Sequence, residues 1–528
     1  MLFFLTLLEF IYILLWTGYL FNRCTKKWWG LIVKTLLLSV FLLLSAILGG
    51  QLSSLYSTGH YIDVLTLSNL DAYKDVGWKI FISSAIIILI CLALTVAVAF
   101  TAKNSWYSVI RWPILMYCLF FWCINPQGAL FNFGKTYTAL ITQNCFSPDA
   151  KLRQFQQQLY GKEDTFVNDA DVSEILDLRN KNIVVVFAEG FSAQWIDKFN
   201  QYKSLTPNLD RFLEQAIYFD NYYNHTAATF RGLRGQLTSS YQYRGGVMVD
   251  KKGLAEISDE SIRKSLSGRL VSIPHILKDN GYHSYFLVAH HNNYSLNQML
   301  QTLEFDNVYG ADDFLNDNSG KDLTDQQIFY GLSGLINSNK LDEPYFIGMY
   351  NVGTHLGQDS PDVKYGDGQN SLLNTIRNFD DAFGKFWDTV KDQKDLVIIF
   401  TADHAAYPSG LYNQTFKTNR QYFVDKIPFA IWSHGLKSMV MDAYGRNSLD
   451  FAPTLLQSMG IKHAFNYFLG CSLFGSDCPR KFEYLHCEGG WCLQTPTLRV
   501  LDSEKAEDLV ELQEIKNFYN LSEDRNSN

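Results

Sequence analysis

Carboxylate and imidazole side chains recur directly after short, strongly apolar runs in the second half of the chain. Glu189 follows the run 183–188, and Asp403 and His404 follow the run 396–402. Histidines come after two further runs in the same way: His290 and His291 after 284–289, and His355 shortly after 345–350. Oxygen and imidazole donors of these types are the ligands that divalent cations accept in proteins. The pattern therefore predicts a metal site.

Each of these residues also has a structural explanation when it is taken alone. Glu189 could cap a helix that begins near Ser192, the histidines could be ordinary loop residues, and Asp403-His404 could form a turn. Their joint occurrence favours chemistry, because ligands of open α/β sheets bind beyond the carboxyl ends of the strands. Four independent loops have no other shared reason to carry ligand-type side chains.

The segment 221–240 offers a nucleophile for such a site. Thr229 stands just before an expected helix, where free backbone N–H groups and a coordinated cation would favour an oxyanion. Arg231 is suited to hold a phosphate through two parallel hydrogen bonds. The alternatives are that Thr229 is a helix N-cap and Arg231 a surface charge. Thr226 is the second choice as nucleophile.

The elements that must position these residues are buried strands alternating with helices. Near-continuous β-branched runs of this kind indicate a mainly parallel central sheet flanked by helices, in an α/β domain spanning 181–495. An aromatic and then polar stretch, 127–180, is expected to run along a membrane surface before this domain. A charged tail, 496–528, follows it.

The first 126 residues are expected to form a transmembrane anchor. Of the 98 Asp, Glu, Lys and Arg residues in the chain, 12 precede residue 131. Helices of about 20 apolar residues cross a bilayer, and four runs reach or approach this length: 2–21, 28–49, 80–101 and 109–126. Glu9 in the first run either reaches the outer interface or has a functional partner.

The distribution of basic residues predicts the orientation of this anchor. Arg23, Lys26 and Lys27 follow the first run, and Lys103 and Arg111 separate the third from the fourth. Basic loops stay in the cytoplasm. The domain after the fourth run is therefore expected outside the cytoplasm.

Four cysteines gather within 22 positions of this exported part: Cys471, Cys478, Cys487 and Cys492. An even cluster in an oxidising compartment predicts two disulfides. The alternative is a four-thiolate zinc site, which the absence of a CxxC pair disfavours. Cys145 is left without an assignment. Exported disulfides are typical of a periplasm, and hence of the inner membrane of a bacterial cell.

The overall composition excludes several classes of protein. Apolar residues make up 47% of the chain and Gly and Pro are not abundant, which excludes intrinsic disorder and collagen. A net charge of -8 without a basic stripe argues against a nucleic-acid partner. Nothing in the sequence predicts an oligomeric state.

Several motifs in their order resemble the alkaline phosphatase/sulfatase-like superfamily. The chain is most similar to its membrane-anchored lipoteichoic acid synthase and phosphoglycerol transferase enzymes. The motifs that carry this resemblance are Glu189 after a strand, TPNLDRFLEQAIYFDNYY at 206–223, TFRG at 229–232, GYHSYFLVAHHNN at 281–293, His355, FTADH at 400–404 and LDFAPTLLQSMGI at 449–461. The likeness covers roughly 300 residues, and its specificity lies in the order of the motifs.

The resemblance implies a ligand set and a nucleophile. In that family the positions matching Glu189, Thr229, Asp403 and His404 bind one divalent metal, commonly Mn²⁺, and the threonine is the nucleophile. The oxygen and imidazole ligands of this chain would also suit Zn²⁺ or Mg²⁺. The positions matching His355 and one of His290 or His291 contact the substrate. Members that bind glycerol phosphate often carry an aromatic residue and an Asn-Arg pair after the first histidine, whereas this chain reads NNYSLNQML there.

The expected function is transfer of glycerol phosphate from phosphatidylglycerol, through a covalent threonine intermediate, to an envelope glycan or polymer. A phosphoethanolamine transferase is the first alternative, although its usual SDHGES-type sequence is replaced by TADHAAYPS. A true sulfatase is disfavoured, because no Cys/Ser-x-Pro-x-Arg motif occurs. A non-catalytic lipid-binding protein on the same fold is the third alternative.

Overall fold

The computed structural model divides the chain into two compact units. One unit comprises residues 1–67, 76–146 and 408–421, and the other comprises 68–75, 147–407 and 422–528. The structure describes residues 2–23, 28–59, 61–62, 78–101, 128–142, 172–226, 228–240, 271–315, 320–338, 340–420, 424–461, 468, 470–475, 484–487, 490–494 and 500–501.

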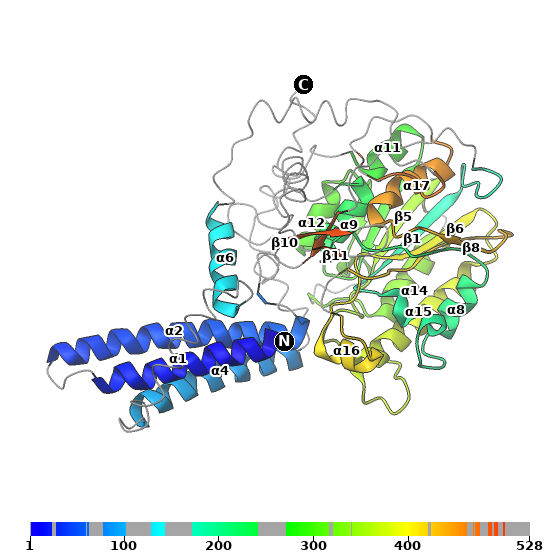
Figure 1. Ribbon diagram of the computed structural model, residues 1–528. Coiled ribbons are helices and arrows are strands. Elements are labelled where there is room, and N and C mark those ends of the chain that lie inside the picture. Colours follow the sequence, from blue (N-terminus) through cyan, green and yellow to red (C-terminus); the bar gives the residue numbers. More distant parts are fainter. Residues whose placement is uncertain are drawn as a thin grey trace, which may run out of the picture. The chain divides into compact units, whose positions relative to one another are not determined.

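Three long apolar helices dominate the first unit (Figure 1). They are α1 (Leu2–Arg23), α2 (Trp28–Thr58) and α4 (Trp78–Thr101), and each is long and apolar enough to cross a membrane. They coincide with the first three predicted spans, although α2 continues beyond the predicted end. The fourth predicted span, 109–126, lies outside the described residues.

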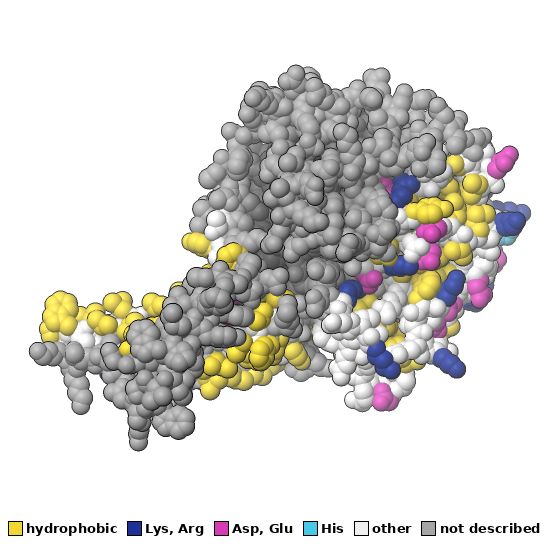
Figure 2. Space-filling model, in the orientation of Figure 1, with side chains coloured by type: hydrophobic (Ala, Val, Ile, Leu, Met, Phe, Trp, Pro, Cys, Tyr) yellow, Lys and Arg dark blue, Asp and Glu magenta, His cyan; other side chains and the backbone are white. Residues whose placement is uncertain are grey.

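Apolar side chains cover the outside of this helical unit as well as its core. Phe10, Phe41 and Leu52 are buried between the helices, whereas Leu31 and Leu89 are more than 60% exposed. Figure 2 accordingly shows hydrophobic side chains over the described surface of these helices. A surface of this kind is stable in a hydrocarbon solvent rather than in water.

The carboxylate of Glu9 is buried inside the helical unit and caps another helix. Its Oε2 accepts a hydrogen bond from the backbone N–H of Leu130 at 3.1 Å. Leu130 belongs to the first turn of α6 (Ala129–Thr142), whose N–H groups have no partner within the helix. Glu9 therefore has a partner, and that partner is structural.

The segment 408–421, distant in sequence, belongs to the same helical unit. It contains α16 (Gly410–Phe416). Gly59 has a φ of 84°, and a Cβ at this position would lie 2.5 Å from the carbonyl oxygen of Pro408. Only glycine allows this approach. The local sequence of 408–421 gave no sign of this packing.

An eight-stranded, mostly parallel sheet forms the second unit, as the fold class predicted. The strand order is β4-β3-β5-β1-β6-β7-β2-β8, and only the pairings of β7 are antiparallel. The strands are β1 (Asn182–Ala188), β2 (Ile217–Asp220), β3 (His283–Val288), β4 (Asn307–Tyr309), β5 (Tyr345–Tyr350), β6 (Leu396–Ala402), β7 (Phe429–Ser433) and β8 (Met439–Asp442).

Helices cover both faces of this sheet (Figure 1). One face carries α8 (Pro207–Leu213), α14 (Asp325–Ile336) and α15 (Ser371–Val390), of which α15 contacts the other two. The other carries α9 (Thr229–Thr238), α11 (Ile273–Asp279), α12 (Ser295–Gln301) and α17 (Phe451–Ser458). The short α13 (Asp312–Leu315) and the 3-10 turns Ala193–Trp195, Asp197–Phe199 and Ser448–Asp450 complete the described helical elements of this unit.

Strand β1 lies between β5 and β6 and is buried along its whole length, as are its two neighbours. Strands covered on both faces need continuous apolar runs, which is the pattern that predicted them. The register pairs Phe187 with Tyr350 and Ala188 with Ala402. The residues that follow these three strands therefore emerge at one edge of the sheet.

A separate antiparallel sheet contains β9 (Tyr484–Cys487), β10 (Gly490–Gln494) and β11 (Val500–Leu501). In its register Cys487 pairs with Gly490 and Cys492 with Leu485, so these two cysteines are not directly opposite. Cys478 and Cys145 lie outside the described residues. The two disulfides stay a prediction.

The close contact between β5 and β3 gives a test of the sheet packing. A Cβ at Gly348 would lie 2.4 Å from two ring carbons of Phe286. We expect Gly348→Ala to lower the free energy of unfolding by about 1–3 kcal/mol through overpacking. Gly334→Ala in α14, where nothing lies within 4 Å, is the control and should be neutral or slightly stabilising. Thermal unfolding of the full chain measures both, and equal midpoints would contradict this packing.

Candidate functional site

Three predicted ligands meet beyond the carboxyl ends of β1 and β6. Glu189 follows β1, and Asp403 and His404 follow β6, which runs parallel to β1 in register. The backbone N–H of Gly190 donates to Asp403 Oδ1 at 2.9 Å, so the two strand ends are tied together. All three side chains are buried.

The donor atoms of these three residues lie within 4.8 Å of one another. His404 Nε2 is 3.7 Å from Glu189 Oε1 and 3.5 Å from Asp403 Oδ2. Ligand atoms that bind one ion at about 2.1 Å can be at most about 4.2 Å apart. Two of the separations meet this limit directly, so the cluster needs little adjustment to hold a cation.

The hydrogen bonds around the cluster leave the correct atoms available for a cation. His404 Nδ1 lies 2.8 Å from the carbonyl oxygen of Ala405, and donation there makes Nε2 the nitrogen of the ring that carries the lone pair. Asp403 Oδ1 accepts hydrogen bonds from Gly190 and from the backbone of His404. Asp403 Oδ2 is buried and has no hydrogen-bond partner among the described residues. A buried carboxylate oxygen in this state fits a divalent cation.

The Thr229 hydroxyl reaches the same cluster. Its Oγ1 donates to Glu189 Oε2 at 3.0 Å and lies 3.3 Å from the hydroxyl of Tyr350. Thr229 is the first residue of α9, and the N-cap is Ala228, whose side chain makes no capping bond. The alternative that Thr229 is a simple N-cap is therefore wrong. Its side chain is half-buried, which leaves the hydroxyl approachable.

The backbone just before Thr229 is strained. Ala228 has a φ of 73° and a ψ of 141°, a conformation that residues with a Cβ rarely adopt. Strain of this kind persists only where the surrounding structure enforces it, and it concentrates at functional sites.

Helix α9 is held tightly against the end of β6. A Cβ at Gly232 would lie 2.1 Å from the carbonyl oxygen of Asp403, and Gln236 Nε2 donates to the carbonyl oxygen of Ala402 at 2.9 Å. The buried His225, which precedes α9, packs against Gly235 of this helix. Burial lowers the pKa of the His225 imidazole to about 3. These contacts fix Thr229 relative to the carboxylates.

Two carboxyl groups so close together cannot both keep a charge easily. Burial, together with the charge of Glu189, raises the pKa of Asp403 well above its usual value. Burial also disfavours a charge on Glu189, but His404 and His355 outweigh it and lower the pKa of that residue. Burial and the neighbouring carboxylates raise the pKa of Tyr350 well above its usual value, so its hydroxyl stays protonated.

One of the predicted substrate-binding histidines, His290, lies 6.0 Å from Tyr350 between ring centroids, and the Tyr350 hydroxyl contacts Glu189. His290 is buried, stacks on Tyr294 at 4.0 Å between ring centroids, and places Nδ1 3.1 Å from Asp322 Oδ2. His291 is half-buried and meets Tyr294 edge-on. His355 is half-buried in the turn after β5, and its effect on the pKa of Glu189 places it near the cluster.

Arg231 and Thr226, both singled out in the sequence, are buried. Arg231 lies in the first turn of α9 and is only 3% exposed, so it is not a surface charge. The carbonyl oxygen of Thr226 accepts a hydrogen bond from Asn224 Nδ2 at 2.7 Å. The Thr229 hydroxyl, by contrast, is bonded to a cluster carboxylate.

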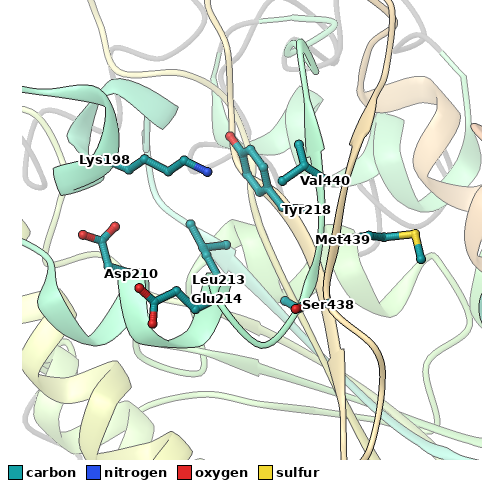
Figure 3. Close-up of a pocket in the computed structure, with 9 residues that line it drawn as sticks. Lys198, Asp210, Leu213, Glu214, Tyr218, Ser438, Met439 and Val440 are labelled. Atoms are coloured by element: carbon teal, nitrogen blue, oxygen red, sulfur yellow. The ribbon is translucent and has the colours of Figure 1, made fainter.

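A cavity of about 410 Å³ lies elsewhere in this unit, between α8, the edge strand β8 and its neighbour β2. Figure 3 shows Lys198, Asp210, Glu214 and Tyr218 around it. None of the predicted site residues lines this cavity.

The sequence profile of the sulfatase family matches residues 181–461. The chain belongs to the sulfatase family. This match covers β1 and the segments that carry Glu189, Thr229, Asp403 and His404. A comparison with curated proteins finds no match.

Solved structures share the fold of this sulfatase-family chain. A protein of the alkaline phosphatase superfamily from Vibrio parahaemolyticus is 18% identical, with a TM-score of 0.52 and coverage of 72% of this chain and 97% of its own. The lipoteichoic acid synthase LtaP from Listeria monocytogenes is 14% identical, with a TM-score of 0.51 and coverage of 71% and 97%. At these identities the likeness shows the fold alone, and it confirms the predicted fold class.

A buried polar network lies next to the candidate metal ligands of this sulfatase-family chain and was not predicted from the sequence. Asn351 accepts a hydrogen bond from the backbone N–H of Glu189 at 2.9 Å and donates to Asp325 Oδ1 at 2.9 Å. Thr354 donates to the carbonyl oxygen of Glu189, and burial raises the pKa of Asp325 to about 6. The available signal was the polar run NVGTH after β5, in which only His355 was considered.

Tyr350 is a further residue that sequence reasoning missed. Its hydroxyl donates to Glu189 Oε2 at 2.5 Å. It is the last residue of an apolar strand, where an aromatic residue has the appearance of a core residue. The available signal was its hydroxyl group at the end of a strand, since three other strands of the sheet are followed by candidate site residues.

The raised pKa of Asp403 predicts how cation binding depends on pH. Burial and the charge of Glu189 raise the pKa of the Asp403 carboxyl, and a bound cation favours its deprotonated form, so binding should release protons and tighten as pH rises. Calorimetric titration of the full chain with Mn²⁺, in buffers of different ionisation enthalpy, measures the release. Asp403→Asn should abolish binding, and Asp395→Asn, a surface change before β6, should not. Affinity that is independent of pH would contradict this account.

Proposed function

We propose that the chain is a membrane-anchored, metal-dependent phosphotransferase that moves a glycerol-phosphate headgroup from phosphatidylglycerol to an envelope glycan or polymer. The observation that carries this proposal is the Thr229 hydroxyl, which lies 3.0 Å from a carboxylate of a three-residue cation cluster. An alcohol in this setting is suited to attack a phosphodiester and to form a covalent intermediate.

In this proposal Glu189, Asp403 and His404 hold a divalent cation, with the Thr229 hydroxyl as the fourth ligand. Such a cation lowers the pKa of a bound hydroxyl and neutralises charge on phosphoryl oxygens. The donor set suits Mn²⁺, Zn²⁺ or Mg²⁺, and we propose Mn²⁺ because the family resemblance implies it. The chain's own residues then orient the two reacting groups and carry the protons.

The first step joins the Thr229 Oγ to the phosphorus atom and breaks the bond from phosphorus to the diacylglycerol oxygen. The Thr229 proton passes to Glu189 Oε2, to which it is hydrogen-bonded. His355 or one of the pair His290 and His291 supplies a proton to the diacylglycerol oxygen. Arg231 stabilises charge on the phosphoryl oxygens.

The second step reverses the roles of these groups. The hydroxyl of an acceptor attacks the phosphorus atom and gives its proton to the histidine. The bond between Thr229 and phosphorus breaks, and Glu189 returns the proton to the threonine oxygen. Enzyme and protons are restored, and the headgroup phosphate has moved to the acceptor.

The membrane helices have a physical role in this function. A lipid donor is confined to the bilayer, so tethering residues 181–495 through an anchor at 1–126 raises the effective concentration of donor at the site. We place the protein in the inner membrane of a bacterial cell as a multi-pass protein with its catalytic domain in the periplasm. The stretch 127–180 and the tail 496–528 flank the domain in this proposal.

Membership of the sulfatase family does not by itself assign sulfatase activity. The nucleophile position holds Thr229 rather than a cysteine or serine that can mature to formylglycine. A non-catalytic role is disfavoured, because the three cluster donors and the threonine hydroxyl occur together.

One observation favours phosphoethanolamine as the headgroup instead. The carboxylate of Asp322 stands beside His290 and is 31% exposed. A partly exposed carboxylate near the substrate histidines would suit an ammonium group better than a neutral glycerol. Phosphoethanolamine transfer is therefore the second candidate function.

Substitution of the nucleophile tests the reaction. We expect Thr229→Ala to abolish headgroup release from phospholipid vesicles and to remove the covalent adduct. Thr226→Ala is the matched control, since the hydroxyl bonded to Glu189 is that of Thr229, and it should keep headgroup release and the adduct. Intact-mass analysis of the Mn²⁺-loaded full chain measures the adduct. Headgroup release at the normal rate by Thr229→Ala would contradict the mechanism.

The mass of the adduct separates the two headgroups. Incubation with vesicles of mixed phosphatidylglycerol and phosphatidylethanolamine should yield a glycerol-phosphate adduct on Thr229 if the first proposal holds. A phosphoethanolamine adduct on the same residue would replace the first candidate with the second. Tandem mass spectrometry of the Thr229 peptide assigns the site in either case.

A further inference from the structure

Tyr350 occupies a place in the site that none of the predicted roles covers. It ends β5 and pairs with Phe187 of β1 and Val288 of β3, so its backbone is fixed between two parallel strands. The side chain is 1% exposed. Tyr350 lies at the carboxyl edge of the sheet. Its hydroxyl therefore reaches Glu189, which follows β1, and Thr229, which begins α9.

Three oxygen atoms lie close together there, and two hydrogen bonds converge on one of them. The Tyr350 hydroxyl donates to Glu189 Oε2 at 2.5 Å, Thr229 Oγ1 donates to the same oxygen at 3.0 Å, and the two hydroxyls are 3.3 Å apart. A tyrosine that only filled the core would not need its hydroxyl on the oxygen that the nucleophile uses. Charge-assisted bonds to a carboxylate are also the stronger kind.

The two carboxylate oxygens of Glu189 have different neighbours. Oε2 is engaged by Thr229 and Tyr350, whereas Oε1 faces Nε2 of His404 at 3.7 Å. The carboxylate is thereby oriented with one oxygen toward the cation cluster and the other toward the nucleophile. Groups that orient a metal ligand in this way contribute strongly to metal affinity.

We propose that Tyr350 is a catalytic residue whose hydroxyl orients Glu189 and supports the attacking oxygen of Thr229; this role rests on the proposed function. As the bond between Thr229 Oγ and phosphorus forms and the bond to the leaving oxygen breaks, the Thr229 proton moves to Glu189 Oε2. The Tyr350 hydroxyl can then turn its own hydrogen toward the threonine oxygen, 3.3 Å away. Tyr350 keeps its proton throughout, so it acts as a donor and not as a base.

The test is Tyr350→Phe in the full chain, which removes one oxygen atom and keeps the ring. Two readouts are needed: the Mn²⁺ dissociation constant without substrate, and the rate of adduct formation on Thr229 at saturating Mn²⁺. We expect Mn²⁺ affinity to fall about 10-fold or more and adduct formation to slow by roughly 100-fold. Tyr345→Phe is the matched control, because Tyr345 is a buried tyrosine at the other end of β5 and should change neither readout.

Two results would overturn this role. One is wild-type Mn²⁺ affinity together with a wild-type rate of adduct formation in Tyr350→Phe. The other is loss of both readouts together with loss of the cooperative melting transition, which would make Tyr350 a structural residue only. If the unaltered chain bound no Mn²⁺ and formed no adduct, the failure would instead be that of the proposed function.

Discussion

Two buried carboxyl groups and one imidazole point at the same small volume, and the structure of the site depends on this arrangement. Glu189 and Asp403 sit at the ends of neighbouring parallel strands, within reach of His404 Nε2. Like charges at this separation in a buried place are costly unless a proton or a cation lies between them. A divalent cation would satisfy all three donors, and in the proposed function it would activate the neighbouring Thr229 hydroxyl.

Other contacts in the second unit hold these three residues and Thr229 in place. The register of β1 and β6 brings the carboxylates together, Gly232 and Gln236 hold α9 against the end of β6, and α9 carries Thr229 to Glu189. Behind the cluster, Asn351 and Asp325 anchor the backbone of Glu189. These contacts all act on groups of the candidate site.

Much of this arrangement could be predicted from the sequence, because it follows from a rule about strand ends. Continuous apolar runs predicted β1, β3, β5 and β6. The positions directly after β1 and β6 then identified Glu189, Asp403 and His404 as candidate ligands. The strands β2, β4, β7 and β8 escaped notice because they are short and lie toward the edges, where apolar runs are interrupted. Tyr350 and the packing of 408–421 with the helical unit depend on contacts between distant segments, which leave no local pattern.

The most direct test of this account is the location of the cation itself. Anomalous diffraction from crystals of the full chain soaked in Mn²⁺ should reveal one ion about 2.0–2.3 Å from donor atoms of Glu189, Thr229, Asp403 and His404. An ion bound at another place, or the absence of any ion from this cluster at saturating Mn²⁺, would contradict the account.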